Sequence, residues 1–317
     1  MKPRVTVIIP CYNAAPYLRA TLESVMSQTH APFEVLVIDD GSTDQSAAIA
    51  RSFAPPLRLI SQTNQGESIA RNRGIDEAQG DWIAFLDADD LWLPNKLERQ
   101  LAAVQADVVG VHTNYKAFGT CKYIRDLSKI SPVKRYSIER FFLGQTSLTL
   151  STLMVSRSLH ARFPNWTQYA EDAIYFAEVS RLGKMVLVPE ILTAVRCHPA
   201  SQSAATGIAA HWHETFLEWL RRNEQTLDFR MVCTLRRKLL ERLVHQCFKA
   251  YYKCKWNDYN LLRNYLARYA DDSAVKALLD EKIPPRWLYT LRQVLGKLSA
   301  SWQELRGRVF FAEVRTI

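Results

Sequence analysis

Apolar residues in the first hundred positions follow two alternating spacings. Short β-branched runs at residues 5–9 and 33–38 are typical of buried strands, and residues 17–28 between them carry apolar side chains at helical spacing. The same order continues with helices expected at 46–53 and 68–78 and strands expected at 57–61 and 82–86. This alternation predicts a parallel sheet covered by helices, in which ligands bind beyond the carboxyl ends of the strands.

The pattern is weaker between residues 100 and 134, and it becomes helical beyond about residue 206. A strand is expected at 107–111 and a loop rich in Lys, Arg and Ser at 122–134. Further elements are strands at 151–156 and 184–188, a helix at 171–182, and helices at 212–222, 229–252, 259–270 and 287–305. The sequence therefore predicts an α/β domain followed by a helical region.

Charge is distributed unevenly along the chain. The net charge is +9 at pH 7, and residues 207–317 hold 20 Lys and Arg against 12 Asp and Glu. A basic, aromatic-rich region of this kind suggests an anionic partner, either nucleic acid or a lipid surface. No apolar run approaches the roughly 18 residues that a transmembrane helix needs, so we expect no membrane span.

The cysteines show no paired spacing. There are six, scattered without a C-x-x-C pair: Cys11, Cys121, Cys197, Cys233, Cys247 and Cys254. This distribution argues against a zinc site and against a disulfide framework. Reduced thiols in a cytoplasm are the expectation.

Polar residues follow the first two expected strands. The segment from Pro10 to Asn13 comes after the first strand, and the segment from Asp39 to Asp44 comes after the second. Two carboxylates at a strand end, followed by a tight Gly turn, can hydrogen-bond the base and ribose of a nucleotide, and Asp40 is the candidate. Ser42, Thr43 and Asp44 are also typical of residues that cap the next helix, and the two interpretations are compatible.

A polar loop leads into the helix expected at 68–78. Its Ser68, Arg71 and Asn72 can face a phosphate or a base, because helix N-termini and Arg side chains suit anions. The alternative is a capped surface helix in which Arg71 pairs with a carboxylate.

Three acids, Asp87, Asp89 and Asp90, come directly after an apolar strand. Their mutual repulsion and desolvation are unfavourable unless a cation or a donor neutralises them. A divalent metal bound by carboxylate and phosphate oxygens resolves the conflict, and Mg²⁺ and Mn²⁺ prefer such ligands. The alternative is an acidic surface turn.

Taken in order, these segments resemble family 2 of the nucleotide-sugar glycosyltransferases, which have the GT-A fold. The matching stretches are Val-Ile-Ile-Pro-Cys-Tyr-Asn, Asp-Asp-Gly-Ser-Thr-Asp, Asn-x-Gly-x-Ser-x-Ala-Arg-Asn-x-Gly and Asp-Ala-Asp-Asp. The resemblance is strong over residues 4–100, fair to about 205 and absent beyond. It implies a Rossmann-like, mostly parallel GT-A sheet flanked by helices over 1–206, with a nucleotide and metal half over about 1–105 and an acceptor half over about 106–206. A basic helical region over 207–317 would follow.

The resemblance also implies roles for individual residues of the nucleotide and metal half. Pro10 and Tyr12 would line the base pocket, Tyr12 by stacking, while Asp40 would bind the base. Asp87 would contact the ribose or the metal shell, and Asp89 would be the principal ligand of a divalent metal, Mn²⁺ or Mg²⁺. Further nucleotide contacts would come from Asn13, Ser68 and Arg71.

The implied catalytic base lies downstream. The family uses a carboxylate that often stands in a Glu-Asp pair at the start of a helix, and Glu171-Asp172 matches this pair, so the base is assigned to Asp172. The segment Arg196-x-His198-x-x-Ser201-x-Ser203 is similar to a loop that closes over the donor diphosphate, and His198 would join the metal shell. Three more site candidates are Glu171, Arg196 and Trp92.

The implied reaction is an inverting transfer from a nucleotide-diphosphate sugar, with a UDP-sugar as the family-level expectation. The metal at Asp89 would stabilise the leaving diphosphate, and Asp172 would deprotonate the acceptor hydroxyl from the opposite face. The acceptor would be a saccharide or a lipid-linked molecule in cell-surface polysaccharide or glycolipid synthesis. The expected location is the cytoplasm, with peripheral contact at the inner face of the membrane through aromatic, basic helices that include Trp212, Trp256, Trp287 and Trp302.

Two other functions remain open. A sugar nucleotidyltransferase shares a parallel-sheet nucleotide site, but it usually needs a Gly-rich basic loop after the first strand, where this chain has Pro10 to Asn13. A catalytically silent sugar-nucleotide-binding or scaffold protein would not need both Asp89 and Asp172. Nucleic acid is not an expected partner, because no nucleic-acid-binding module is recognisable.

Overall fold

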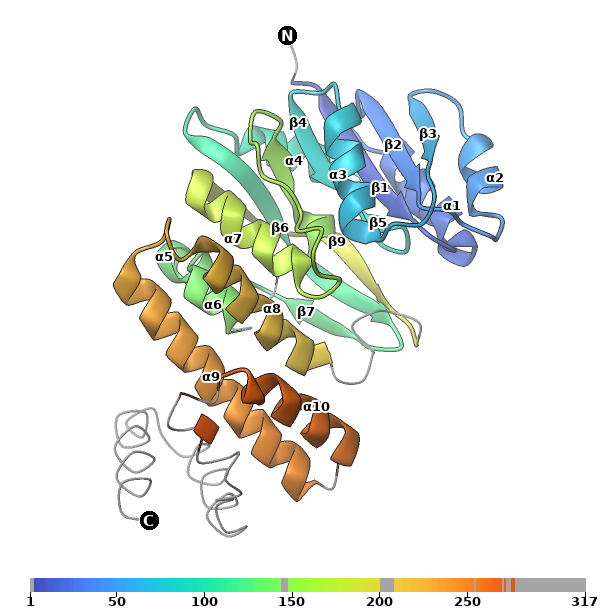
Figure 1. Cartoon of the computed structure of the whole chain (residues 1–317). Coiled ribbons are helices and arrows are strands. Elements are labelled where there is room, and N and C mark those ends of the chain that lie inside the picture. The colour runs from blue at the N-terminus through green and yellow to red at the C-terminus, as the bar shows by residue number, and fades with distance from the viewer. Residues whose placement is uncertain are drawn as a thin grey trace. The chain divides into compact units, whose positions relative to one another are not determined.

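A computed structural model describes residues 3–143, 148–199, 208–253, 255–269, 271 and 275–276 of the chain. It divides into two compact units, Met1–Thr206 and Gly207–Ile317. The first unit is an α/β domain, a mixed β-sheet flanked by helices, and the described part of the second unit is helical (Figure 1).

One half of the sheet is parallel, in the order β3-β2-β1-β4. Its strands are β1 (Val5–Cys11), β2 (Glu34–Asp39), β3 (Leu57–Ser61) and β4 (Trp82–Phe85). The helices between them are α1 (Ala15–Met26), α2 (Ser46–Arg51) and α3 (Glu67–Glu77). Every residue of β1 and β2 is buried, because both faces of these strands are covered, and this explains their continuous apolar runs.

The position of α3 depends on a glycine. A Cβ placed on Gly74 would lie 2.5 Å from Cγ2 of the buried Ile8, so only glycine allows α3 to lie this close to β1. On the other face of the sheet, Val5, Val7 and Ile9 belong to the core that includes apolar residues of α1. The close contact with β1 sets the height of α3 above the sheet and therefore the place of its side chains.

The other half of the sheet is mixed, with β8 (Met154–Ser156), β6 (Val108–Gly119), β9 (Lys184–Cys197) and β5 (Leu91–Trp92) continuing from β4. The β6–β9 pair is parallel and the other pairs here are antiparallel. A short strand, β7 (Tyr123–Arg125), pairs with β6 alone. Four more helices of this unit are α4 (Lys96–Ala102), α5 (Pro132–Arg135), α6 (Ile138–Phe142) and α7 (Glu171–Leu182).

The strands β6 and β9 are much longer than the expected strands at 107–111 and 184–188. Buried polar residues interrupt the apolar pattern, and bulges interrupt the β6–β9 register around Thr113 and Asn114. Asn114 is nonetheless satisfied inside the sheet, where its Nδ2 donates to Asp126 Oδ1 at 3.0 Å. The expected loop at 122–134 is also wrong in part, because it contains β7 and α5.

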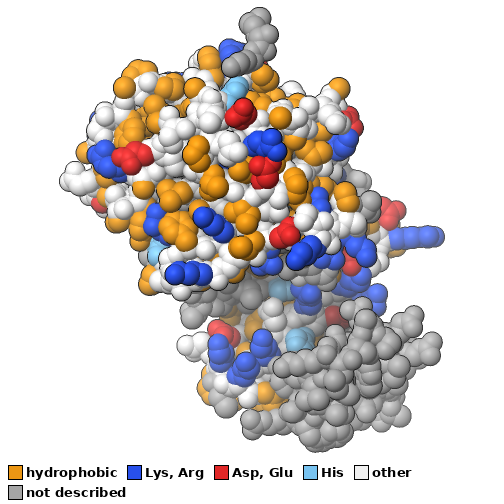
Figure 2. Space-filling view, turned by 180° about the vertical axis from the view of Figure 1, so that it is seen from behind, with side chains coloured by type: hydrophobic (Ala, Val, Ile, Leu, Met, Phe, Trp, Pro, Cys, Tyr) orange, Lys and Arg blue, Asp and Glu red, His pale blue; other side chains and the backbone are white. Residues whose placement is uncertain are grey.

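The described second unit consists of α8 (Ile208–Asn223), α9 (Phe229–Tyr252) and α10 (Trp256–Ala267). The side chain of Asp228 caps α9 by accepting from Met231 N at 2.9 Å. Figure 2 shows Lys and Arg side chains on the described surface of these helices. The helix expected at 287–305, with Trp287 and Trp302, lies outside the described residues. None of the described helices combines the length and apolar character needed to cross a membrane.

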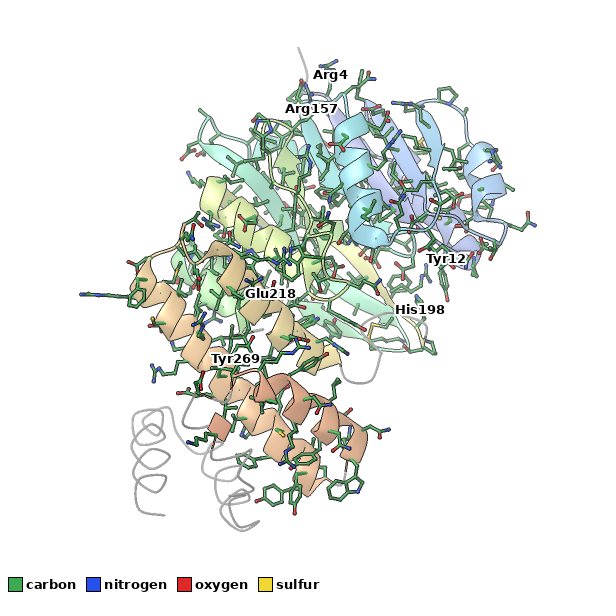
Figure 3. All side chains as sticks on the ribbon, in the orientation of Figure 1. Arg4, Tyr12, Arg157, His198, Glu218 and Tyr269 are labelled. Carbon is green, nitrogen blue, oxygen red and sulfur yellow. A yellow bond between two sulfur atoms is a disulfide. The ribbon has the colours of Figure 1, made fainter. Side chains whose placement is uncertain are left out.

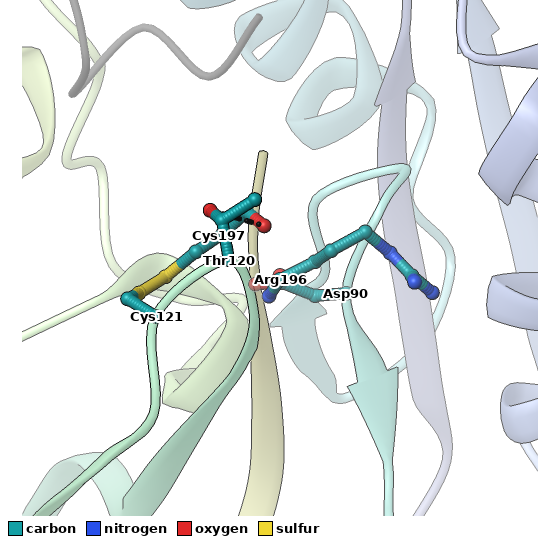
Figure 4. Close-up of a disulfide and its surroundings, with 5 residues drawn as sticks. All are labelled: Asp90, Thr120, Cys121, Arg196 and Cys197. Atoms are coloured by element: carbon teal, nitrogen blue, oxygen red, sulfur yellow. Dashed lines mark hydrogen bonds between the residues drawn. A yellow bond between two sulfur atoms is a disulfide. The ribbon is translucent and has the colours of Figure 1, made fainter. Parts of the chain in front are cut away.

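A disulfide joins Cys121, which follows β6, to Cys197 at the end of β9 (Figure 4). The expectation of reduced thiols is therefore wrong for this pair. The two residues are 76 positions apart in sequence, but β6 and β9 lie side by side, and the Cα atoms are 5.6 Å apart. Spacing along the chain carries no trace of this proximity. Cys11, Cys233 and Cys247 are free thiols.

Candidate active site

The predicted site residues gather at the carboxyl ends of β1, β2 and β4, together with the end of β9 and the start of α7. Figure 3 labels Tyr12 and His198, which come from the ends of β1 and β9, along the same edge of the first unit. Tyr12 is 54% exposed, so its ring is available for stacking, whereas Pro10 and Ser68 are buried. Their contacts with a nucleotide stay predictions.

Asp40 organises the loop that leads into α3. Its Oδ1 accepts from Gln62 Nε2 at 2.8 Å and from Gln65 N at 2.9 Å, and its Oδ2 accepts from Gly66 N at 2.8 Å. The carboxylate is buried, and these three hydrogen bonds stabilise it there. Asp40 thus shapes this side of the site, and its contact with a base stays a prediction.

Asn13 ties the loops after β1 and β2 together. Its backbone N–H donates to Ser42 Oγ at 3.0 Å, and its Oδ1 accepts from Thr43 N at 2.8 Å. The expectation that Ser42, Thr43 and Asp44 all cap the next helix is therefore wrong for the first two. Asp44 alone reaches α2, where its Oδ1 accepts from Ser46 N at 2.9 Å.

Arg71 lies at the centre of the acidic residues and is 3% exposed. Its Nη2 donates to Asp87 Oδ1 at 2.9 Å and to Glu67, and its Nη1 donates to Glu171 Oε1 at 3.3 Å. These ion pairs connect α3, the loop after β4 and the first residue of α7. The geometry is that of the carboxylate-pairing alternative, while a direct contact between Arg71 and a phosphate stays a prediction.

Burial dominates the ionisation of the acids near Arg71. It raises the pKa of Glu67 and of Glu171 to about 7, and the guanidinium of Arg71 offsets part of the rise in each. Burial also raises the pKa of Asp172 to about 6, against the hydrogen bond that its Oδ1 accepts from Ala173 N at 2.6 Å. A carboxyl group with a pKa of about 6 is ionised at neutral pH and basic enough to accept a proton.

The three acids after β4 have different surroundings. Asp90 is 2% exposed, and its oxygens accept from Arg196 N at 2.8 Å and from Ser151 Oγ at 2.7 Å. Asp89 Oδ2 instead lies 2.9 Å from His198 Nε2. Burial and the nearby Asp87 raise the pKa values of Asp89 and Asp90 above the usual value for an aspartate. Asp90 therefore holds the loop in place, while Asp89 and His198 form a pair of metal-ligand type.

Arg196 fixes the end of β9 beside these acids. Its Nε donates to Asp89 O at 2.8 Å, and its guanidinium carbon lies 4.9 Å from the ring centroid of Tyr17 and 4.5 Å from that of Phe118. Two residues on, the ring of His198 lies 4.8 Å from that of Tyr17. Ser201 and Ser203, expected in the closing loop, lie outside the described residues.

Ser151 is a supporting residue that no motif indicated. Besides its bond to Asp90, its Oγ accepts from Asp87 N at 3.1 Å, and its carbonyl accepts from Trp92 Nε1 at 2.7 Å. Trp92, a candidate from the sequence, is thus buried beneath the acids. The Nζ of Lys96 lies 4.0 Å from the centroid of its ring. A lone serine far along the chain gives no signal in a single sequence.

The residues present fit a divalent metal whose remaining ligands would come from phosphate oxygens and water. Among the described residues, no group of three or more His, Cys, Asp and Glu side chains could hold a metal ion. Asp89 and His198 nevertheless supply one carboxylate oxygen and one imidazole nitrogen side by side. Mg²⁺ and Mn²⁺ sites commonly use one or two carboxylates with substrate phosphates and water.

Comparison with known proteins identifies the class. Residues 6–163 match the family described as "Glycosyl transferase family 2". An uncharacterized glycosyltransferase of a Nostoc species is 34% identical over 226 residues, which cover 67% of this chain and 70% of the relative. The chain therefore belongs to glycosyl transferase family 2, as its motifs predicted.

Solved structures show the same fold. The S. aureus protein TarS (residues 1–349), crystallised with UDP-GlcNAc, aligns with a TM-score of 0.68 at 19% identity, covering 87% of this chain and 83% of TarS. The mannosyltransferase PcManGT of Pyrobaculum calidifontis, in complex with GDP-Man and Mn²⁺, aligns with a TM-score of 0.57 at 19% identity, covering 89% and 80%. The predicted GT-A fold with C-terminal helices is confirmed.

Proposed function

We propose that this glycosyltransferase moves a sugar from a nucleotide-diphosphate donor, a UDP-sugar, to a hydroxyl group with inversion and with a divalent metal. The observation that carries the proposal is the placement of Asp172. This carboxyl, with a pKa of about 6, stands at the start of α7 beside Glu171, which Arg71 joins to Asp87. TarS and PcManGT, solved with UDP-GlcNAc and with GDP-Man and Mn²⁺, support a nucleotide-sugar donor.

Each residue has a role in this reaction. Asp172 accepts the proton of the acceptor hydroxyl as the oxygen attacks the anomeric carbon from the face opposite the diphosphate. Asp89 and His198 would hold the metal, which when bound neutralises charge on the departing diphosphate. Arg71, through Glu171, positions the start of α7 and with it the base. Tyr12 stacks on the nucleotide base beside the loop that Asp40 shapes.

The acceptor in this proposal is a saccharide or a lipid-linked molecule of a cell-surface polysaccharide or glycolipid pathway. The catalytic unit would be Met1–Thr206, and the basic helices of Gly207–Ile317 would contact the cytoplasmic face of a membrane. The unequal charge along the sequence supports this second part. Vesicle cosedimentation of a helical-unit variant such as Phe229→Ser/Arg230→Gln tests it, because unchanged binding would contradict the contact.

The test is a screen of UDP-, GDP- and dTDP-sugars for release of nucleoside diphosphate by the purified full chain with Mn²⁺ or Mg²⁺. Asp172→Asn should lower turnover about 10²- to 10⁴-fold, because it removes the general base. A second reaction, with a nucleoside triphosphate and a sugar 1-phosphate, decides between the alternatives, since a nucleotidyltransferase releases pyrophosphate from that mixture and a silent binder forms a product in neither reaction. Wild-type turnover by both Asp172→Asn and Asp89→Asn would show that the site assignment is wrong, and NMR of the product anomer tests inversion.

A further inference from the structure

The strand β7 and the residue before it form an exposed surface on the first unit. All three residues of β7 are exposed, and Tyr123 and Ile124 have 45% and 65% of their surface accessible. Exposed basic side chains flank these two residues. The hairpin surface, as we call it, consists of Lys122, Tyr123, Ile124 and Arg125.

The positive charges of the hairpin surface are not neutralised within the described part of the chain. Neither of its two basic side chains, Lys122 and Arg125, forms an ion pair with a carboxylate of the described residues. Asp126 is the only acid between residues 122 and 134, and its carboxylate is hydrogen-bonded to Asn114 and Ser128. Its Oδ1 accepts from Asn114 Nδ2 and from Ser128 N, both at 3.0 Å. The surface therefore presents cations beside exposed apolar groups.

The hairpin surface adjoins the candidate active site. β7 pairs with the end of β6, where Ala117 lies opposite Tyr123, and two residues on Gly119 pairs with Cys197 of β9. Thr120 N donates to the carbonyl of Cys197 at 3.0 Å. The residue after Cys197 is His198, the neighbour of Asp89. A partner bound at the hairpin surface would thus lie close to the residues that hold the donor.

We propose that the hairpin surface docks on an anionic lipid bilayer. Tyr and Ile side chains insert at the boundary between headgroups and acyl chains, while Lys and Arg side chains contact anionic headgroups. A protein partner fits less well, because a strand of three residues offers a short edge and two apolar side chains make a small interface. A saccharide gains nothing from an exposed isoleucine. This docking does not require the proposed transfer reaction.

Cosedimentation of the full chain with sonicated vesicles tests the docking. One set contains equal parts of phosphatidylcholine and phosphatidylglycerol, and the other contains phosphatidylcholine alone. Each basic residue near an anionic surface changes affinity about fivefold, so Lys122→Gln/Arg125→Gln should bind the mixed vesicles about 25-fold more weakly. Ile124→Ser should also weaken binding, and added salt should reduce the effect of the charge change.

Matched controls separate a local surface from net charge. Arg19→Gln/Arg51→Gln removes two exposed charges from α1 and α2, and Leu182→Ser removes an exposed apolar side chain from α7. We expect both controls to bind mixed vesicles like the wild type, with all variants keeping the wild-type melting temperature. Equal losses in the controls, or wild-type binding by Lys122→Gln/Arg125→Gln, would overturn the proposal. If Lys122→Gln/Arg125→Gln bound vesicles like the wild type but had a raised KM for a soluble saccharide, the hairpin surface would be a binding site for the acceptor instead.

Discussion

Four carboxyl groups and a guanidinium share the centre of the candidate site. Glu67, Asp87 and Glu171 pair with Arg71, and Asp172 lies close enough for Arg71 to lower its pKa against the effect of burial. A buried cation among buried acids is stable only as part of such a network, because each charge removed leaves the others uncompensated. The charge on Asp172 therefore depends on Arg71, although the two side chains share no hydrogen bond in the described structure.

Replacing Arg71 should move the pH dependence of the reaction. As the proposed base, Asp172 must be ionised to accept a proton, so activity should rise with pH through its pKa of about 6. Arg71→Met removes a cation that lowers this pKa, and we expect the acid limb of the kcat profile to shift to higher pH. Arg71→Lys should shift it less, because the charge is kept while the paired geometry is lost. A fall in kcat with an unmoved acid limb would show that Arg71 is only structural.

Ser151 should matter for metal binding although it lies outside the ligand set. Its hydroxyl holds Asp90 and the backbone of Asp87 on either side of Asp89. Ser151→Ala leaves the buried Asp90 carboxyl without one donor, which should destabilise the fold by about 1–3 kcal/mol and weaken Mn²⁺ binding. Urea unfolding measures the first effect, and Mn²⁺ titration by electron paramagnetic resonance in the presence of UDP measures the second. Wild-type values for Ser151→Ala in both would contradict this role.

The elements differ in how well a single sequence specifies them. In the parallel half β1, β2 and β4 are buried, mostly apolar runs, and β3 and α7 begin and end at the residues expected. The mixed half is different because β6 carries buried polar residues whose partners lie far along the chain, as Asn114 does with Pro189 O at 3.2 Å. The motifs likewise indicate which acids matter. They offer a carboxylate partner for Arg71 only as one alternative, and they indicate neither which acids it joins nor that Ser151 supports them, since those contacts form only in the folded sheet.

The disulfide between the ends of two paired strands should contribute to the stability of the fold. Cys121–Cys197 closes a loop of 76 residues and fixes the turn after β6 to the end of β9. Cross-links of this kind typically stabilise a fold by about 2–4 kcal/mol, so reductant or Cys121→Ser should lower the melting temperature. Cys233→Ser, at an exposed free thiol, is the matched control and should leave it unchanged. Two additional reactive thiols in the native, unreduced protein would show that the bond does not form in solution.

For the whole molecule, the metal and the nucleotide should stabilise the fold together. In the proposed site Asp89 and His198 supply two ligands, so the ion would need phosphate oxygens to complete its shell, and the diphosphate would need the ion to approach buried carboxylates. Each ligand should therefore raise the affinity of the protein for the other by the same factor. This mutual dependence separates a metal-assisted donor site from an acidic surface turn.

Thermal unfolding of the full chain measures this coupling. A ligand at about 100 times its Kd stabilises a fold by about 2.7 kcal/mol, so UDP with Mn²⁺ should raise the melting temperature by several degrees. UDP with a chelator, or Mn²⁺ alone, should raise it far less. Asp89→Asn should remove the joint effect because it removes the proposed principal ligand, whereas Asp76→Asn, at an exposed acid of α3 paired with Arg162, should keep it. Equal stabilisation by UDP with and without Mn²⁺ would mean that the donor binds without the metal, and that Asp89 serves another purpose.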